Sequence, residues 1–329
     1  MKILITGGAG FIGQRLAKRL LERNELNGKP VTELVLLDVA RPNDERLLAD
    51  ERVRAETGDI SDPAVLRRHI DTQTEAIFHL AAIVSGQAEA DFDLGMKINL
   101  DASRALLEAC RAAGHKPRVV FTSSVAVYGG ALPDVVQDDT ALNPQSSYGT
   151  QKAIAELLLS DYARRGFVDG RVLRLPTISV RPGKPNAAAS SFASGIIREP
   201  LNGERSTCPV DGDTRLWLLS PKSAVEALIA GCEIEREKLG LRPVINLPGL
   251  SVSVNEMVAA LAEVAGEDVV QRIDWQRDER IERIVCSWPG AWNTARAEEL
   301  GLSGDKNFAD VIRAYIAENH AENHTDERS

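Results

Sequence analysis

The feature that constrains this chain most is a run of glycines directly after its first apolar stretch. Lys2–Thr6 has the pattern of a short buried strand, and Gly-Gly-Ala-Gly-Phe-Ile-Gly follows it before an amphipathic helical pattern begins. Such a turn needs glycines where a Cβ would block a pyrophosphate, and the free N–H groups at the helix start then bind the phosphates. The pattern predicts a dinucleotide site, and the residues expected at the pyrophosphate are Gly7, Gly10, Phe11, Ile12 and Gly13.

Strand-like and helix-like patterns alternate through the first half of the chain. The apolar runs are short and apolar on both faces, as buried parallel strands are, and helical spacing recurs between them, for example at Ile12, Leu16 and Leu20. This alternation predicts an α/β fold with a Rossmann-type doubly wound parallel sheet. The expected strands are Lys2–Thr6, Leu34–Asp38, Ala76–Leu80, Arg118–Thr122 and Gly170–Leu175.

The alternation of strand-like and helix-like patterns ends after Leu175. Prolines interrupt residues 176–209, and helical patterns dominate from Ser251 onward. We therefore expect a dinucleotide-binding domain over residues 1–175, to which residues 214–245 return. Residues 176–213 and 246–329 are expected to form a smaller, mostly helical C-terminal substrate lobe.

Asp38 ends the second predicted strand, at a spacing from the glycines somewhat beyond the usual roughly 20 residues. A carboxylate there accepts hydrogen bonds from both ribose hydroxyls of NAD and repels the additional phosphate of NADP. We therefore expect NAD as the cofactor, although Arg41 nearby leaves some use of NADP open. Further cofactor contacts are expected near the next strand ends, from Asp59, Ile60, Leu80, Ala81 and Ala82.

Tyr148 and Lys152 are four residues apart at the start of a helical pattern, which puts both side chains on one helix face. A free phenol has a pKa of about 10, and a neighbouring ammonium lowers that pKa. Tyr148 is therefore a candidate general base for a substrate hydroxyl. The segment Thr122-Ser123-Ser124 at the end of the fourth strand supplies hydroxyls, one of which can hold the substrate oxygen beside Tyr148.

Charge and cysteine content narrow the class of protein. Asp and Glu total 48 against 39 Lys and Arg, a net charge of −9, which disfavours nucleic acid as a partner. The four cysteines form no CxxC pair, so we expect reduced thiols and no metal site. The chain lacks a signal-peptide pattern and a run of apolar residues long enough for a membrane span. We expect a cytoplasmic protein that acts on a small molecule and not at a membrane.

In combination, these motifs resemble the extended short-chain dehydrogenase/reductases, the superfamily of nucleotide-sugar epimerases and dehydratases, over nearly the whole chain. The resemblance implies a catalytic role for Ser124 with Tyr148 and Lys152, and it makes Ser123 the less favoured serine. It also implies that Asn99 supports a water relay to the lysine. Cofactor contacts are implied for Asn99, Tyr148 and Lys152, and at the nicotinamide carboxamide for Pro176, Thr177 and Ile178.

A narrower resemblance is to the dehydrogenases that oxidise the 2-hydroxyl of a four-carbon sugar acid, through residues 79–86, 147–152, 174–178 and 181–190. An acid substrate needs a planar donor such as arginine close to Tyr148. Arg181 and Arg215 both remain open for that role. The expected substrate-binding residues are Ser124, Tyr148, Arg181, Asn186, Ser190 and Arg215.

Two other interpretations compete with the sugar-acid dehydrogenase. A nucleotide-sugar 4-epimerase with tightly bound NAD is the main alternative, whereas Thr122-Ser123-Ser124 disfavours a dehydratase. A non-enzymatic NAD sensor is disfavoured because both Tyr148 and Lys152 are present. A homodimer through the helix that carries these two residues is suggested only by analogy with the family.

Overall fold

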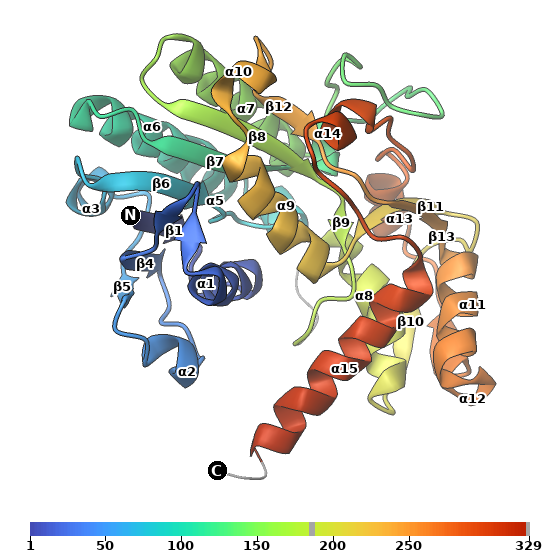
Figure 1. The fold of residues 1–329 in the computed structure, drawn as a ribbon. Coiled ribbons are helices and arrows are strands. Elements are labelled where there is room, and N and C mark those ends of the chain that lie inside the picture. The colour runs from blue at the N-terminus through green and yellow to red at the C-terminus, as the bar shows by residue number, and fades with distance from the viewer. Residues whose placement is uncertain (184–187, 327–329) are drawn as a thin grey trace.

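The computed structural model describes residues 1–183 and 188–326, and its main domain is built on one sheet of seven parallel strands (Figure 1). The strand order is β12-β8-β7-β6-β1-β4-β5, and every neighbouring pair is parallel. The chain runs outward from β1 in one direction and then from β6 in the other, so the switch point lies between these two strands. The strands are β1 (Lys2–Thr6), β4 (Glu33–Asp38), β5 (Val53–Thr57), β6 (Thr74–His79), β7 (Arg118–Ser124), β8 (Asp169–Leu175) and β12 (Val244–Asn246).

Helices cover both faces of this sheet, which confirms the doubly wound α/β prediction. On β1, Ile3 and Ile5 pack in the core beneath α1 and α9, while Leu4 faces the core beneath α3, α6 and α7. Both faces of a parallel strand are thus buried, which is why the runs are uniformly apolar. The helical elements are α1 (Phe11–Arg23), α2 (Glu45–Leu48), α3 (Pro63–His69), α4 (Ser85–Ala90), α5 (Phe92–Gly95), the π-helical turn η1 (Met96–Asp101), α6 (Ala102–Ala113), the 3₁₀ turn η2 (Val125–Val127), α7 (Ser147–Arg164), α9 (Pro221–Glu233) and α10 (Arg236–Leu239).

Most of the remaining elements form the lobe on one side of the sheet (Figure 1). Its core joins Phe192, Ile196, Leu218 and Met257. It contains a three-stranded sheet in the order β13-β11-β9 and a two-stranded parallel sheet of β10 and β14. Its elements are β9 (Thr177–Ile178), η3 (Ala189–Ser191), α8 (Phe192–Leu201), β10 (Ser206–Cys208), β11 (Arg215–Leu219), β13 (Leu250–Ser253), α11 (Val254–Ala265), α12 (Glu267–Val270), β14 (Ile273–Trp275), α13 (Glu279–Val285) and α15 (Phe308–Asp326). The helix α14 (Ala295–Glu299) instead contacts β12, and its Ala297 packs in the core of the main domain.

The chain returns to the main domain somewhat later than the sequence suggests. Residues 215–219 form β11, which pairs with β9 and β13 in the lobe, and the return begins with α9 and continues with β12. A hairpin of β2 (Glu25–Leu26) and β3 (Lys29–Pro30) follows α1. From the lobe side, α15 reaches back to α1 through an ion pair of 2.8 Å between Glu318 and Arg15.

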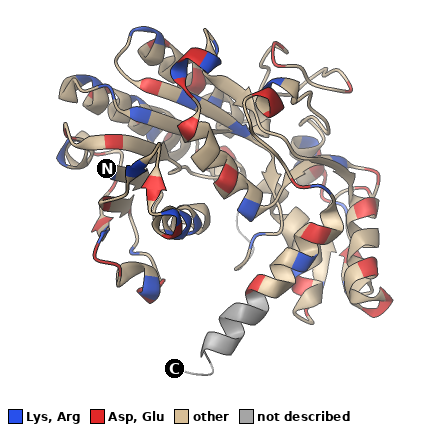
Figure 2. Ribbon diagram, viewed as in Figure 1, with Lys and Arg blue, Asp and Glu red and all other residues tan. Residues whose placement is uncertain are grey.

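Acidic and basic residues alternate along the ribbon without segregating to one part of it (Figure 2). Most ion pairs join surface side chains, such as Arg19 with Glu226 and Arg313 with Glu263. Within residues 1–183 and 188–326, no helix combines the length and the apolar character that crossing a bilayer requires.

Candidate active site

The glycine turn connects β1 to α1 as the sequence predicts. A Cβ on Gly13 would lie 2.2 Å from the carbonyl oxygen of Gly7, so only glycine allows the first helical turn to pack this closely on the loop. The turn is fixed to the neighbouring strand because the Gly7 N–H donates a 2.9 Å hydrogen bond to the carbonyl of Leu37. The start of α1 therefore lies directly over the carboxyl ends of β1 and β4, where a pyrophosphate fits.

Asp38 lies at the end of β4 beside this turn, and its carboxylate accepts a 3.1 Å hydrogen bond from the Ala9 N–H. A cavity of about 420 Å³ extends from here along the strand ends. Hydrogen bonds from Ser61 and the charge of Lys97 lower the pKa of Asp59, against the effect of its partial burial. The predicted cofactor residues that line this cavity are Gly7, Gly10, Asp38, Asp59, Ile60, Leu80, Ala81 and Ala82.

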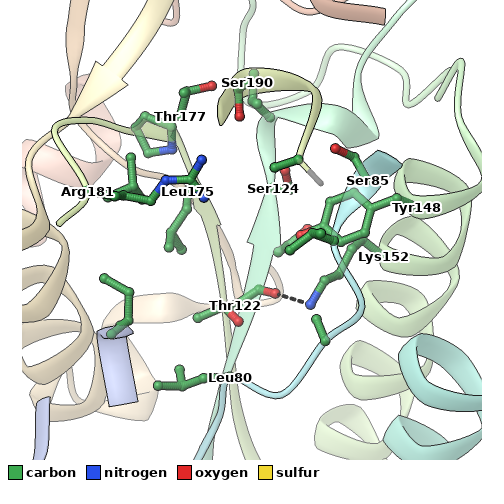
Figure 3. Close-up of a pocket in the computed structure, with 18 of the residues that line it drawn as sticks. Leu80, Ser85, Thr122, Ser124, Tyr148, Lys152, Leu175, Thr177, Arg181 and Ser190 are labelled. Atoms are coloured by element: carbon green, nitrogen blue, oxygen red, sulfur yellow. Dashed lines mark hydrogen bonds between the residues drawn. The ribbon is translucent and has the colours of Figure 1, made fainter. Parts of the chain in front are cut away.

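A second cavity, of about 230 Å³, meets the first at Leu80 and Ala82, which line both (Figure 3). Together the two cavities offer an adenosine end and a nicotinamide end on either side of the glycine turn, so the residues present fit a dinucleotide. The predicted site residues that line the second cavity are Phe11, Ile12, Ser124, Tyr148, Lys152, Pro176, Thr177, Ile178, Arg181 and Ser190.

The start of α7 brings Tyr148 next to the end of β7. Ser146 caps the helix by accepting the Gly149 N–H at 3.2 Å, which places Tyr148 in the first turn. A Cβ on Gly149 would lie 2.0 Å from the carbonyl oxygen of Ala126, so a glycine is required for α7 to approach η2 this closely. The close approach places Tyr148 and Ser124 on the same cavity.

Lys152 is buried below Tyr148, and its ammonium donates a 2.8 Å hydrogen bond to the carbonyl of Thr122 (Figure 3). The Nζ atom lies 4.6 Å from the centroid of the Phe121 ring and 5.8 Å from that of Tyr148. Burial lowers the pKa of Lys152 to about 7, and the charge of Glu156 opposes this fall. Lys152 is thus poised between its neutral and cationic forms near neutral pH.

Burial raises the pKa of Tyr148 to about 12, while hydrogen bonding to Ser124 and the charge of Arg181 oppose the rise. The sequence predicts that Lys152 lowers this pKa, whereas the groups that lower it here are Ser124 and Arg181. The ammonium of Lys152 is directed at the Thr122 carbonyl, and the neighbouring Ser123 hydroxyl is buried without a partner among the described residues.

Asn99 lies in η1, a π-helical turn between α5 and α6. Its Oδ1 accepts the Ile83 N–H at 2.8 Å, and its Nδ2 donates to the Ile83 carbonyl at 3.1 Å and to Gln151 Oε1 at 2.7 Å. These bonds use its polar atoms to hold the loop after β6 and the residue before Lys152. The water relay to the lysine stays a prediction.

Arg181 enters the cavity from the segment after β9, and its guanidinium faces the cavity opposite Tyr148 (Figure 3). Its backbone is fixed because Arg181 N–H donates to Ser194 Oγ at 3.0 Å and its carbonyl accepts from Arg198 Nη1 at 2.6 Å. Among the described side chains, those of residues 1–183 and 188–318, no carboxylate forms an ion pair with Arg181, and burial lowers the pKa of this guanidinium. The side chain is thus a cation at the cavity that lacks a protein counter-ion in the described part of the chain.

The other predicted substrate residues have different positions. Ser190 lines the same cavity, and its neighbour Ala189 donates its N–H to Ser85 Oγ at 3.1 Å. Arg215 does not line the cavity: it begins β11, is about half exposed, and pairs with Glu256 at 3.2 Å. Asn186 lies outside the described residues.

The structure also adds cavity residues that sequence reasoning missed. Val84 and Ser85 follow the predicted strand Ala76–Leu80, and Trp288 comes from the loop after α13. Ser85 lies within the run used for the narrower resemblance, so its position was a usable signal. No pattern in the sequence marks Trp288, because only the packing of the lobe brings it to the site.

Two further polar side chains near the site are buried. His79 bonds with Thr6 Oγ1 at 2.7 Å and with Ser103 Oγ at 2.9 Å, and burial lowers its pKa to about 3. Arg174 is buried in an ion pair with Glu156. Among the residues that the structure describes, no cluster of three or more His, Cys, Asp or Glu side chains is arranged to hold a metal ion.

Comparisons with known proteins agree with this geometry. The chain is 68% identical to a D-erythronate dehydrogenase of Cupriavidus necator, covering 96% of this chain and 98% of the relative. It is 49% identical to a D-erythronate dehydrogenase of Haemophilus influenzae, covering 96% and 99%. A crystal structure of a nucleoside-diphosphate-sugar epimerase from Agrobacterium tumefaciens superposes with a TM-score of 0.91 at 48% identity, covering 96% of this chain and 94% of that one.

The model of the NAD-dependent epimerase/dehydratase family matches residues 3–235, which include the glycine turn, Asp38, Ser124, Tyr148 and Lys152. The match covers the dinucleotide domain up to α9, and the two dehydrogenase relatives each cover 96% of the chain. The chain therefore belongs to the NAD-dependent epimerase/dehydratase family, as an NAD-dependent dehydrogenase of the extended short-chain type.

Proposed function

We propose that this chain oxidises the 2-hydroxyl of a four-carbon sugar acid, D-erythronate, to 2-oxo-tetronate with NAD as the acceptor. The observation that carries the proposal is Arg181, a cation without a carboxylate partner among the described residues that faces Tyr148 across a small cavity. Two relatives named D-erythronate dehydrogenase, at 68% and 49% identity, support the same substrate.

Tyr148 acts as the general base in this proposal, because its phenol is the titratable group that lines the cavity beside Ser124. Ser124 holds the substrate oxygen, and Lys152 in its cationic form stabilises the phenolate. Bound NAD would supply the hydride acceptor for the carbon that carries the reacting hydroxyl. The side chains that hold this end of NAD are Ile12, Pro176, Thr177 and Ile178, with Asn99 supporting the loop after β6.

Arg181 binds the substrate carboxylate next to the reacting carbon. A guanidinium offers two parallel N–H donors that match the two oxygens of a carboxylate. Of the two arginines that the sequence leaves open, Arg181 lines the cavity, whereas Arg215 pairs with Glu256 elsewhere. Ser190 and Asn186 bind the remaining hydroxyls in this proposal.

NAD is preferred over NADP because the Asp38 carboxylate lies beside the glycine turn, where the 2′-phosphate of NADP would meet a like charge. Arg41 lies close in sequence and leaves a low level of NADP use within the proposal.

The size of the cavity favours the acid over a nucleotide sugar. About 230 Å³ is below the roughly 300–1,000 Å³ of pockets that enclose drug-sized ligands, and the nicotinamide must share the space. A four-carbon acid fits this volume better than a sugar that carries a nucleoside diphosphate. The observation that favours the epimerase is the likeness in fold to the structure solved as a nucleoside-diphosphate-sugar epimerase.

The experiment that separates the two functions follows NADH absorbance with D-erythronate and, in parallel, with UDP-sugars. Lasting NADH formation on the acid alone is the expected result, because a dehydrogenase releases its reduced cofactor. Interconversion of a UDP-sugar without net NADH would contradict the proposal. L-Threonate and D-glycerate serve as matched acids that differ in configuration and chain length.

We also propose a homodimer formed through α7 and its neighbours. Leu157 on α7 is 68% exposed, Ile154 one turn earlier is 37% exposed, and Phe92 on α5 is 58% exposed. These apolar side chains lie on elements that pack together, so a second copy would cover them. The four cysteines are free, which supports a reducing compartment and hence a cytoplasmic location.

A further inference from the structure

Glu156 lies on α7 one turn beyond Lys152, on the same helix face, and its side chain is only 2% exposed. Arg174 on β8 holds its carboxylate through both oxygens. The Nε atom donates to Oε1 at 2.9 Å and Nη2 donates to Oε2 at 2.7 Å. The carboxylate is therefore fixed in position as well as buried.

A second layer of hydrogen bonds fixes Arg174 in turn. Its Nη1 donates to the Tyr128 hydroxyl at 2.6 Å, and that hydroxyl donates to Asn246 Oδ1 at 2.9 Å. Tyr128 is fully buried, follows η2, and packs against Trp292, while Asn246 ends β12. Arg174 thus holds the carboxylate of Glu156 directly, and Tyr128 and Asn246 hold Arg174.

Such an arrangement is a costly way to stabilise a fold. Removing two charges from water has a large desolvation penalty, and apolar side chains of similar volume often serve stability equally well. A buried ion pair one helical turn from a buried lysine therefore calls for a role beyond packing.

We propose that Glu156, oriented by Arg174, is a positioning residue that keeps Lys152 cationic inside the protein. This inference rests on the proposed partnership of Lys152 with Tyr148, in which the ammonium stabilises the phenolate. The directions of the pKa shifts agree with it, because burial disfavours the charge on Lys152 and Glu156 favours it.

The other charged and titratable groups around α7 do not supply this effect. On β6, His79 is neutral because burial lowers its pKa to about 3. On the lobe side, Arg181 is a cation and opposes a second positive charge. Glu89 and Glu108, from α4 and α6, contact α7 at its two ends, through Ser147 and Tyr162.

The test compares two variants that separate charge from shape. Glu156→Gln keeps the size of the side chain and removes the charge, whereas Glu156→Asp keeps the charge and shortens the side chain. Without the charge, the pKa of Lys152 falls, the phenolate loses its counter-ion, and the pKa of Tyr148 rises. We expect the rise of kcat/KM with pH to move upward by about one unit in the Gln variant and to stay near wild type in the Asp variant.

A pH profile of Glu156→Gln in which kcat/KM rises with the same midpoint as in wild type would overturn the inference, even if its maximum were lower. A packing defect lowers kcat/KM at every pH alike and leaves the midpoint unchanged. An equal shift in both variants would overturn it too. The double variant Glu156→Gln/Arg174→Gln leaves no unpaired buried charge, so it keeps the test open if the single variant does not fold. We expect a smaller upward shift in that protein, and no shift would count against the inference.

A substrate-independent readout separates this inference from the substrate assignment. Near-ultraviolet difference titration of the NAD complex reports phenolate formation at Tyr148, with Tyr148→Phe as the blank. We expect the Glu156→Gln complex to titrate at higher pH than the wild-type complex. If D-erythronate is not oxidised but this shift is seen, only the proposed substrate fails. If D-erythronate is oxidised and both titrations coincide, only the inference fails.

Discussion

The ammonium of Lys152 donates its hydrogen bond to the backbone carbonyl of Thr122, on the strand that also carries Ser124. The lysine of α7 is thereby anchored to the end of β7, and Lys152 and Thr122 both line the cavity. Tyr148, one turn earlier on α7, lies over the same cavity. The spacing of the two residues on one helix and the anchor on β7 together define the proposed proton-transfer site.

Replacing Tyr148 by Phe tests the proposed base. The variant keeps the ring and loses the hydroxyl, so turnover should fall by about 10²–10⁴-fold, the range that general acid–base groups contribute. NAD binding, followed by fluorescence titration, should change little because most cofactor contacts lie elsewhere. Turnover within a few fold of wild type would exclude Tyr148 as the base.

Lys152 should leave a signature in the pH dependence of stability. Its folded-state pKa is about 7 and its unfolded value is 10.5, so between these values the unfolded chain binds more protons. The contribution of Lys152 to the free energy of unfolding therefore rises as the pH increases from about 7 to 10.5. Urea unfolding at several pH values should show this slope in wild type. The slope should be reduced in Lys152→Met, and equal slopes in the two proteins would contradict the depressed pKa.

Arg181 and Arg215 form a matched pair of arginine substitutions. Arg181→Gln removes the proposed carboxylate donor, and a hydrogen bond to a charged group contributes about 1.5–3 kcal/mol, which is about 10–150-fold in kcat/KM. Arg215→Gln breaks a half-exposed pair with Glu256 away from the cavity, so its kinetics should stay close to wild type. Larger losses in Arg215→Gln than in Arg181→Gln would reverse the proposed assignment.

Asp38→Ser should shift the cofactor preference toward NADP. Removing the carboxylate eliminates the repulsion of the 2′-phosphate, so the ratio of kcat/KM for NADP to that for NAD should rise about tenfold or more. Asp59→Asn is the control, because Asp59 lines the same cavity without lying beside the glycine turn. A rise of similar size in both variants would point to a general charge effect.

Substitutions of two exposed leucines, one on the proposed dimer face and one away from it, test the proposed homodimer. Leu157→Glu places a charge in the middle of the apolar side chains on α7, and we expect light scattering after size exclusion to show a monomer. Leu241, which is 97% exposed, lies in the loop after α10, so Leu241→Glu should leave the mass unchanged. A wild-type monomer, or a dimer that survives Leu157→Glu, would exclude this interface.

Several parts of the fold follow from local patterns in the sequence. The glycines after Lys2–Thr6, the uniformly apolar strands and the spacing of Tyr148 and Lys152 each act within one element or one turn, so short-range sequence carries them. The carboxyl ends of parallel strands meet at one edge of the sheet, which is why residues from separate strand ends could be assigned to one site.

Other features depend on contacts between distant segments. The sequence leaves both Arg181 and Arg215 open as the donor to the substrate carboxylate. In the structure, the pairing of β11 with β13 places Arg215 beside Glu256, whereas the segment after β9 brings Arg181 to the cavity. Trp288 reaches the site only through the packing of the lobe, and the partnership of Glu156 with Arg174 joins α7 to β8. The sequence by itself determined the dinucleotide fold and the proposed base. The tertiary structure alone decided which cations and aromatic side chains line the cavity, because burial and pairing arise between residues that no local pattern connects.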